Sequence, residues 1–167
     1  MIPDCECNRV YFSALLPEAC PVTYRGLVEV LDRYGVPHSL LQGTKDIWCR
    51  DYMPLQMMSH EFVVFQYRPD YLLDSNEHEA SLTDGYEAAK ANGIDYIHDE
   101  RGIKLDGGNT VHDGGKVILT SKIFEENPGM PYDYLCRTLR MNLGAEPVTE
   151  YLSWTGEKSL RQETLRN

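Results

Sequence analysis

The sequence predicts a single α/β domain built from a repeated strand–helix–strand unit. A length of 167 residues suits one domain. Three runs rich in β-branched and aromatic residues are typical of strands: RVYFSALL, FVVFQY and KVILTS, which begin at Arg9, Phe62 and Lys116. Their apolar parts start at Val10, Val63 and Val117, so they recur after 53 and 54 residues. A fixed spacing is typical of a structural repeat, although strands and helices alternate in any α/β protein.

In the first unit, a helix is predicted at residues 22–34, before a second strand at residues 36–41. The helix is predicted by apolar residues that recur three and four positions apart, namely Leu27, Val28, Leu31 and Tyr34. Gly35 follows directly, and glycine tolerates the left-handed conformation that often ends a helix. The first unit is therefore expected to span residues 9–41.

The second and third units repeat this order. Their helices are predicted at residues 77–92 and 132–142, and each meets a glycine, Gly93 or Gly144. A further strand-like run follows each glycine, at residues 94–99 and 145–152. These units are expected to span residues 62–98 and 116–151.

A charged segment follows the second strand of each of the first two units. The first segment is GTKDIWCRDYMP, which contains Asp51, and the second is ERGIKLDGGNTV, which contains Asp106. The two aspartates are 55 residues apart, which is one period of the repeat. A repeat arranged around a central axis would bring both carboxylates to one place.

Two carboxylates in a partly apolar pocket suit a guanidinium group, whose planar fork of N–H donors pairs with carboxylates bidentately. Trp48 offers a flat wall for such a cation. Asn109 adds an amide, and the glycines after Asp106 let the backbone approach a ligand closely. These residues predict a guanidinium-binding site.

Structural explanations of the same residues remain open. Arg50 and Asp51 would also suit an ordinary ion pair beside a buried Trp48, and DGGN is a good tight-turn sequence. HDGGK, residues 112–116, predicts a turn that joins two strands as a hairpin. The spacing of one period between the two aspartates favours a functional site.

The chain resembles a known family in three segments. WCRDYMP resembles the Trp-x-Arg-Asp-x-x-Pro motif of agmatine deiminases and bacterial peptidylarginine deiminases. LDGGNTVHDGGKVILTSKIFEENP resembles their Glu/Asp-Gly-Gly segment with the hairpin and strand that follow, and MIPDCECNRVYFS resembles their first strand. The resemblance spans residues 1 to about 148. Because these proteins are penteins, it implies a partial α/β propeller with about three of five strand–helix–strand units.

The resemblance also implies an activity. Family members hydrolyse a guanidinium to a ureido group and ammonia, with a Cys nucleophile, a His acid and base, and no metal or organic cofactor. Asp51 then binds the guanidinium, and Asp106 takes the acidic position of the second motif. Trp48, Arg50 and Asn109 complete the expected substrate-binding set. The substrate is agmatine, in putrescine biosynthesis, or peptidyl-arginine, and the sequence leaves this choice open.

The chain departs from the family after residue 152. No histidine follows His112 and no cysteine follows Cys136, whereas the family places its catalytic His in the next unit and its Cys near the end of a longer chain. Residues 1–152 are therefore expected to form a partial deiminase domain, and residues 153–167 a divergent polar tail. Cys49 is expected to point away from Asp51 in an extended segment, and Cys136 to lie in the core.

A truncated or frame-shifted form without activity is expected from these absences, and a natural short form remains open. The alternatives are a non-catalytic guanidinium-binding or self-assembling module, and an unrelated α/β domain with a coincidental repeat. A ring of three units in place of five would leave strand edges open, so a homo-oligomer is expected.

Composition excludes several classes of partner. The net charge of −10 disfavours nucleic acid, which binds clustered Lys and Arg, and mildly favours cationic ligands. No apolar run approaches the roughly 20 residues of a membrane helix. The first residues lack a basic segment followed by an apolar one, so no secretory signal is predicted and a cytoplasmic location is expected.

Overall fold

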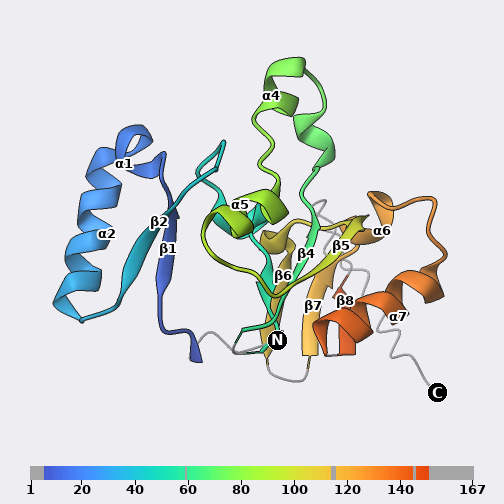
Figure 1. The fold of residues 1–167 in the computed structure, drawn as a ribbon. Helices are drawn as coiled ribbons and strands as arrows, with labels where there is room; N and C mark the ends of the chain where they lie inside the picture. The colour runs from blue at the N-terminus through green and yellow to red at the C-terminus, as the bar shows by residue number, and fades with distance from the viewer. Residues whose placement is uncertain (1–5, 59, 114–115, 145, 151–167) are drawn as a thin grey trace.

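The computed structural model describes residues 6–58, 60–113, 116–144 and 146–150. For Asp113 and residues 146–150, only the backbone is described. Its elements confirm the α/β class and follow one another in three groups along the chain (Figure 1). Each group contains two parallel strands connected by helices. The predicted tail at residues 153–167 lies outside the described residues.

In the first group, β1 (Val10–Ser13) pairs in parallel with β2 (His38–Leu41). Helices α1 (Leu16–Ala19) and α2 (Pro21–Arg33) connect them, and Gly35 follows with a left-handed φ of 64°.

The predicted apolar face of α2 is partly wrong. Leu27 and Tyr34 are exposed. Val28 and Leu31 are half-buried as predicted. Tyr24 is the third half-buried position, and its ring meets Phe12 of β1 edge-on. The helix is therefore rotated so that the stripe beginning at Tyr24 faces the strands.

The second group is a three-stranded sheet. β3 (Leu55–Gln56) pairs antiparallel with β4 (Phe62–Gln66), and β4 pairs in parallel with β5 (Ile97–Lys104). Between β4 and β5 lie η2 (Asp70–Leu72), α4 (Asn76–Ala80) and α5 (Gly85–Ala91).

The prediction of one continuous helix at residues 77–92 was wrong, because the structure has two helices, α4 and α5, separated by a short non-helical segment. The Asp84 side chain accepts hydrogen bonds from the backbone N–H groups of Tyr86 and Glu87, and it thereby starts a new helix. The cap residue lies in the middle of the range that was predicted to be helical.

The third group confirms the predicted hairpin. β6 (Thr110–Asp113) pairs antiparallel with β7 (Lys116–Thr120), and β7 pairs in parallel with β8 (Glu146–Glu150). Helices α6 (Lys122–Glu125) and α7 (Tyr132–Leu143) lie between these parallel strands. Gly144 ends α7 in the left-handed region, with φ of 60°.

The main hydrophobic core joins the second and third groups. It consists of buried apolar residues from β3, β4, β5, β7, α6 and α7: Leu55, Val63, Phe65, Ile103, Leu105, Val117, Leu119, Ile123, Leu135, Leu139 and Leu143. The last three residues recur every four positions and form the buried face of α7. The first group contributes nothing to this cluster and lies to one side of it (Figure 1). Within the part of the chain that is described, no helix is long and apolar enough to cross a membrane.

Candidate functional site

The segment WCRDYMP folds into a one-turn helix, α3 (Cys49–Tyr52), so the expectation of an extended segment was wrong. Tyr52 anchors this turn, because its ring is buried and its hydroxyl lies 3.1 Å from the Asp46 carbonyl oxygen and 3.3 Å from Cys49 Sγ. The Asp46 carboxylate accepts a hydrogen bond of 2.8 Å from the Trp48 N–H. A charged residue, Asp46, and an aromatic residue, Tyr52, thus both stabilise this turn, which explains why the two kinds of side chain are mixed in the segment.

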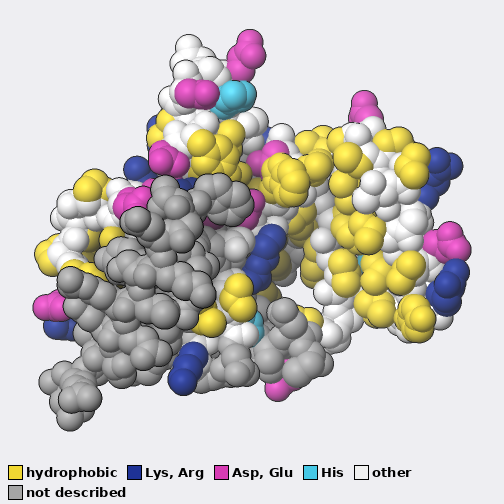
Figure 2. Space-filling view, turned by 180° about the vertical axis from the view of Figure 1, so that it is seen from behind, with side chains coloured by type: hydrophobic (Ala, Val, Ile, Leu, Met, Phe, Trp, Pro, Cys, Tyr) yellow, Lys and Arg dark blue, Asp and Glu magenta, His cyan; other side chains and the backbone are white. Residues whose placement is uncertain are grey.

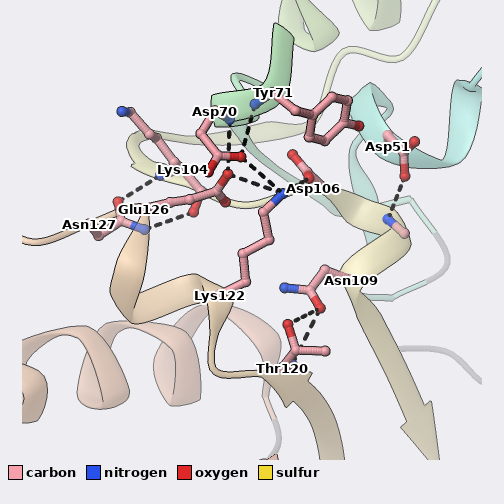
Figure 3. A network of polar contacts seen from close by, with 11 residues as sticks. Asp51, Asp70, Tyr71, Lys104, Asp106, Asn109, Thr120, Lys122, Glu126 and Asn127 are labelled. Carbon is pink, nitrogen blue, oxygen red and sulfur yellow. Dashed lines mark hydrogen bonds and ion pairs between the residues drawn. The ribbon is translucent and has the colours of Figure 1, made fainter. Parts of the chain in front are cut away.

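The second segment folds against the first. LDGGN places Asp106 just before η3 (Gly107–Asn109), a 3₁₀ turn that packs on α3. The Gly108 N–H donates a hydrogen bond of 3.1 Å to Asp51 Oδ1 (Figure 3). The two motifs, 55 residues apart in the sequence, are therefore in direct contact.

Two glycines make this contact possible. A Cβ on Gly107 would lie 2.1 Å from the carbonyl oxygen of Arg50, and a Cβ on Gly108 would lie 2.1 Å from Asp51 Oδ1. Both distances are far inside van der Waals contact. A side chain at Gly107 would therefore force the two turns apart, whereas one at Gly108 would displace the Asp51 carboxylate.

The carboxyl groups of Asp51 and Asp106 both have a raised pKa, and the Asp51 charge contributes to the rise at Asp106. Burial raises the pKa of Asp106, Lys122 opposes the rise, and the charges of Glu126 and Asp51 add to it. Burial also raises the pKa of Asp51, against the hydrogen bond from Gly108 and the charges of Arg50 and Lys122. The two acids therefore lie within electrostatic reach of each other, in surroundings that favour an added cation.

Arg50 and Asn109 bind groups of the protein itself. The Arg50 guanidinium donates to the Thr110 carbonyl oxygen at 3.0 Å, which fastens α3 to the start of β6. Asn109 Oδ1 accepts hydrogen bonds from the backbone N–H and the hydroxyl of Thr120, at 3.3 and 2.8 Å. These contacts assign both residues a positioning role in the structure.

Trp48 is exposed, with 65% of its surface accessible. The alternative explanation, an Arg50–Asp51 ion pair beside a buried tryptophan, is therefore wrong in one respect, because the tryptophan is not buried. The Arg50 guanidinium forms its hydrogen bond with Thr110. An exposed indole next to α3 remains available to cover a ligand.

Sequence reasoning missed four residues that surround Asp106: Asp70, Tyr71, Lys122 and Glu126. Lys122 Nζ lies 3.3 Å from Asp106 Oδ2, 3.2 Å from Glu126 Oε1 and 3.9 Å from Asp70 Oδ1 (Figure 3). A Lys–Glu spacing of four residues in SKIFEEN was a usable signal for part of this cluster. Asp70 and Tyr71 come from a loop after β4 and carry no such signal.

The thiols of Cys49 and Cys136 are not prepared for attack on a ligand. Burial raises the pKa of Cys49, whose sulfur accepts a hydrogen bond from Tyr52. Burial also raises the pKa of Cys136, which lies in the core face of α7 as expected. Both sulfurs are therefore held as thiols at neutral pH. Across the described ranges, no group of three or more His, Cys, Asp or Glu side chains is arranged to hold a metal ion.

Three-dimensional comparison relates this architecture to solved structures. A C. jejuni agmatine deiminase with substrate bound matches 90% of this chain and 55% of its own, with a TM-score of 0.62 and 13% identity. The chain has the fold of agmatine deiminase structures. A structure described as a peptidyl-arginine deiminase matches 90% of this chain and 56% of its own, with a TM-score of 0.60 and 14% identity. The E. faecalis agmatine deiminase gives 86% and 40%, with a TM-score of 0.51 and 18% identity.

These matches confirm the predicted resemblance at the level of the fold. The chain spans about half the length of the solved structures that it matches. No protein-family model matches the sequence, and comparison with curated proteins found no match. At 13–18% identity, these matches show a shared fold and do not assign an activity to this chain.

Proposed function

We propose that this chain binds the guanidinium group of agmatine or of a peptidyl-arginine between Asp51 and Asp106, as one half of a deiminase-type site. The observation that carries the proposal is the contact between α3 and η3, which joins the turn that carries Asp51 to the turn that follows Asp106. Burial raises the pKa of both carboxyl groups. A guanidinium offers two carboxylates more paired N–H donors than an ammonium does, and an aromatic cover such as Trp48 suits its flat face. Solved agmatine deiminases of the same fold, one of them with substrate bound, support this ligand class.

We propose the matching architecture as well. Residues 1–152 form about three of the five units of a pentein-type propeller, and residues 153–167 are a divergent polar tail. The recurrence of parallel strand–helix–strand groups and the partial coverage of the solved structures support this assignment.

We further propose that the 167-residue chain binds without catalysis. Deimination requires a thiolate that attacks the guanidinium carbon and an acid that protonates the departing ammonia. The sequence has no histidine after His112 and no cysteine after Cys136, and the two described thiols near the protein interior are held protonated. In a chain that supplied both groups, agmatine hydrolysis would serve putrescine biosynthesis in the cytoplasm.

Calorimetry and an ammonia assay test this function together. Agmatine should bind the purified 167-residue chain with a Kd below about 1 mM, which corresponds to roughly 4 kcal/mol. N-acetylarginine amide, tested in parallel, represents peptidyl-arginine. Ammonia release should not exceed that of a sample without protein. Absence of binding to both ligands would contradict the proposal, and turnover that disappears in Cys49→Ala would identify Cys49 as the nucleophile.

A second candidate function is self-association with another copy of this chain. The exposed apolar surface of the first group, β1, α1, α2 and β2, favours it. Helix α2 has no buried residue, and hydrophobic side chains gather over this group at the right of Figure 2. Those that α2 exposes include Val22, Leu27 and Val30. Light scattering should give a mass above 19.1 kDa that rises with concentration and falls in Val30→Glu. A constant monomer mass at all concentrations would rule this candidate out.

A further inference from the structure

A lysine side chain of the protein itself already pairs with Asp106, one of the two carboxylates of the candidate site. Lys122 Nζ contacts Asp106 Oδ2 at 3.3 Å and Glu126 Oε1 at 3.2 Å, and it lies 5.0 Å from the centre of the Tyr71 ring (Figure 3). Carboxylates and the face of an aromatic ring are the groups with which proteins bind organic cations. The site is thus built to hold a cation and already holds one.

This internal cation is held without being enclosed. The Lys122 side chain is 29% exposed, whereas the side chains of Asp106 and Glu126 are 12% and 6% exposed. The flexible four-carbon stem of a lysine allows its ammonium to move into solvent while the acids stay in place. Arg50 cannot substitute for it without giving up its hydrogen bond to the Thr110 carbonyl oxygen.

We propose that Lys122 is an internal competitor, which occupies the position of the ligand's cationic group and thereby sets the affinity of the site. The inference rests on the proposed guanidinium-binding function. A guanidinium that pairs with Asp106 replaces the Lys122 ammonium and does not enter an empty space. The form able to bind is then only the fraction of molecules in which Lys122 has left Asp106. If that fraction is about one tenth, the measured Kd is about tenfold weaker than the intrinsic one.

Substitution of Lys122 tests the competition directly. Lys122→Met keeps an unbranched apolar stem and removes the charge, so agmatine should bind about tenfold more tightly in calorimetry of the 167-residue chain. Lys122→Arg places a bidentate partner beside Asp106, so agmatine should bind more weakly than to wild type. Lys90→Met is the matched control, because it removes the same charge from an exposed pair with Asp95. Its Kd should stay within about twofold of wild type.

The outcomes separate this inference from the function on which it rests. If wild type binds agmatine and Lys122→Met binds it equally or more weakly, the competitor role is overturned and the proposed function stands. If neither protein binds, both are overturned. Binding by Lys122→Met alone supports the competitor role and overturns the proposed binding by the wild-type chain. Should Lys122→Met fail to fold, Lys122→Arg decides, and affinity equal to or above that of wild type would overturn the inference.

Discussion

Asp51→Asn should keep the fold and lose most of the affinity for agmatine. The asparagine Oδ1 can still accept the hydrogen bond from the Gly108 N–H, so the contact between α3 and η3 survives. The ligand, however, loses a charge-assisted hydrogen bond worth about 1.5–3 kcal/mol, which corresponds to roughly a 10- to 150-fold higher Kd in calorimetry.

The same substitution should not reduce the stability of the folded chain. Burial raises the pKa of Asp51, so folding disfavours its ionised form. This cost is present above the folded-state pKa and disappears as the pH falls through it. At pH 7 the neutral asparagine should therefore give a thermal midpoint equal to or above that of wild type. A lower midpoint would show that the Asp51 charge stabilises the fold.

Asp95→Asn is the control for long-range charge effects on binding. Asp95 is exposed and pairs with Lys90, so its loss removes one negative charge outside the site. Its Kd for agmatine should stay close to that of wild type. An equal weakening in both variants would mean that the acidic surface attracts the ligand without a defined site.

Gly107→Ala should be the most destabilising single change near the site. The new Cβ would meet the Arg50 carbonyl oxygen at 2.1 Å, and a backbone atom cannot rotate away as a side chain can. Overpacking of this kind costs about 1–3 kcal/mol, and the separation of α3 from η3 would place this variant at the upper end. The thermal midpoint should fall by roughly 6–12 °C, measured by circular dichroism.

Two other glycines make this result interpretable. Gly102→Ala, in β5, meets nothing within 4 Å and should melt within about 2 °C of wild type. Gly108→Ala displaces the Asp51 carboxylate and no backbone atom, so it should lose more affinity than stability. If Gly107→Ala melts at the same temperature as Gly102→Ala, the close packing of the two turns is not a requirement of the fold.

Local patterns were sufficient to predict the hairpin, α7 and the strands other than β3. The four-residue spacing of Leu135, Leu139 and Leu143 appears directly as the core face of α7. The break before α5 was missed although Asp84, with Glu87 three residues later, is a sequence signal for the start of a helix. The rotation of α2 was missed because only a two-stranded sheet is available to cover it.

The site was predictable as far as the repeat reaches. Asp51 and Asp106 are one period apart, and the turns that carry them meet as expected. Lys122 and Asp70 belong to no repeated motif, and they reach Asp106 from two other segments through tertiary packing. A residue that joins a site in this way leaves no periodic signal in the sequence.

A crystal structure of the 167-residue chain with agmatine would locate the guanidinium group and Lys122 together. We expect the guanidinium within hydrogen-bond distance of both Asp51 and Asp106, about 2.7–3.2 Å. We also expect the Lys122 ammonium to have moved away from Asp106. Agmatine bound elsewhere on the chain, with Lys122 still paired to Asp106 and Asp51 free of ligand, would contradict both expectations.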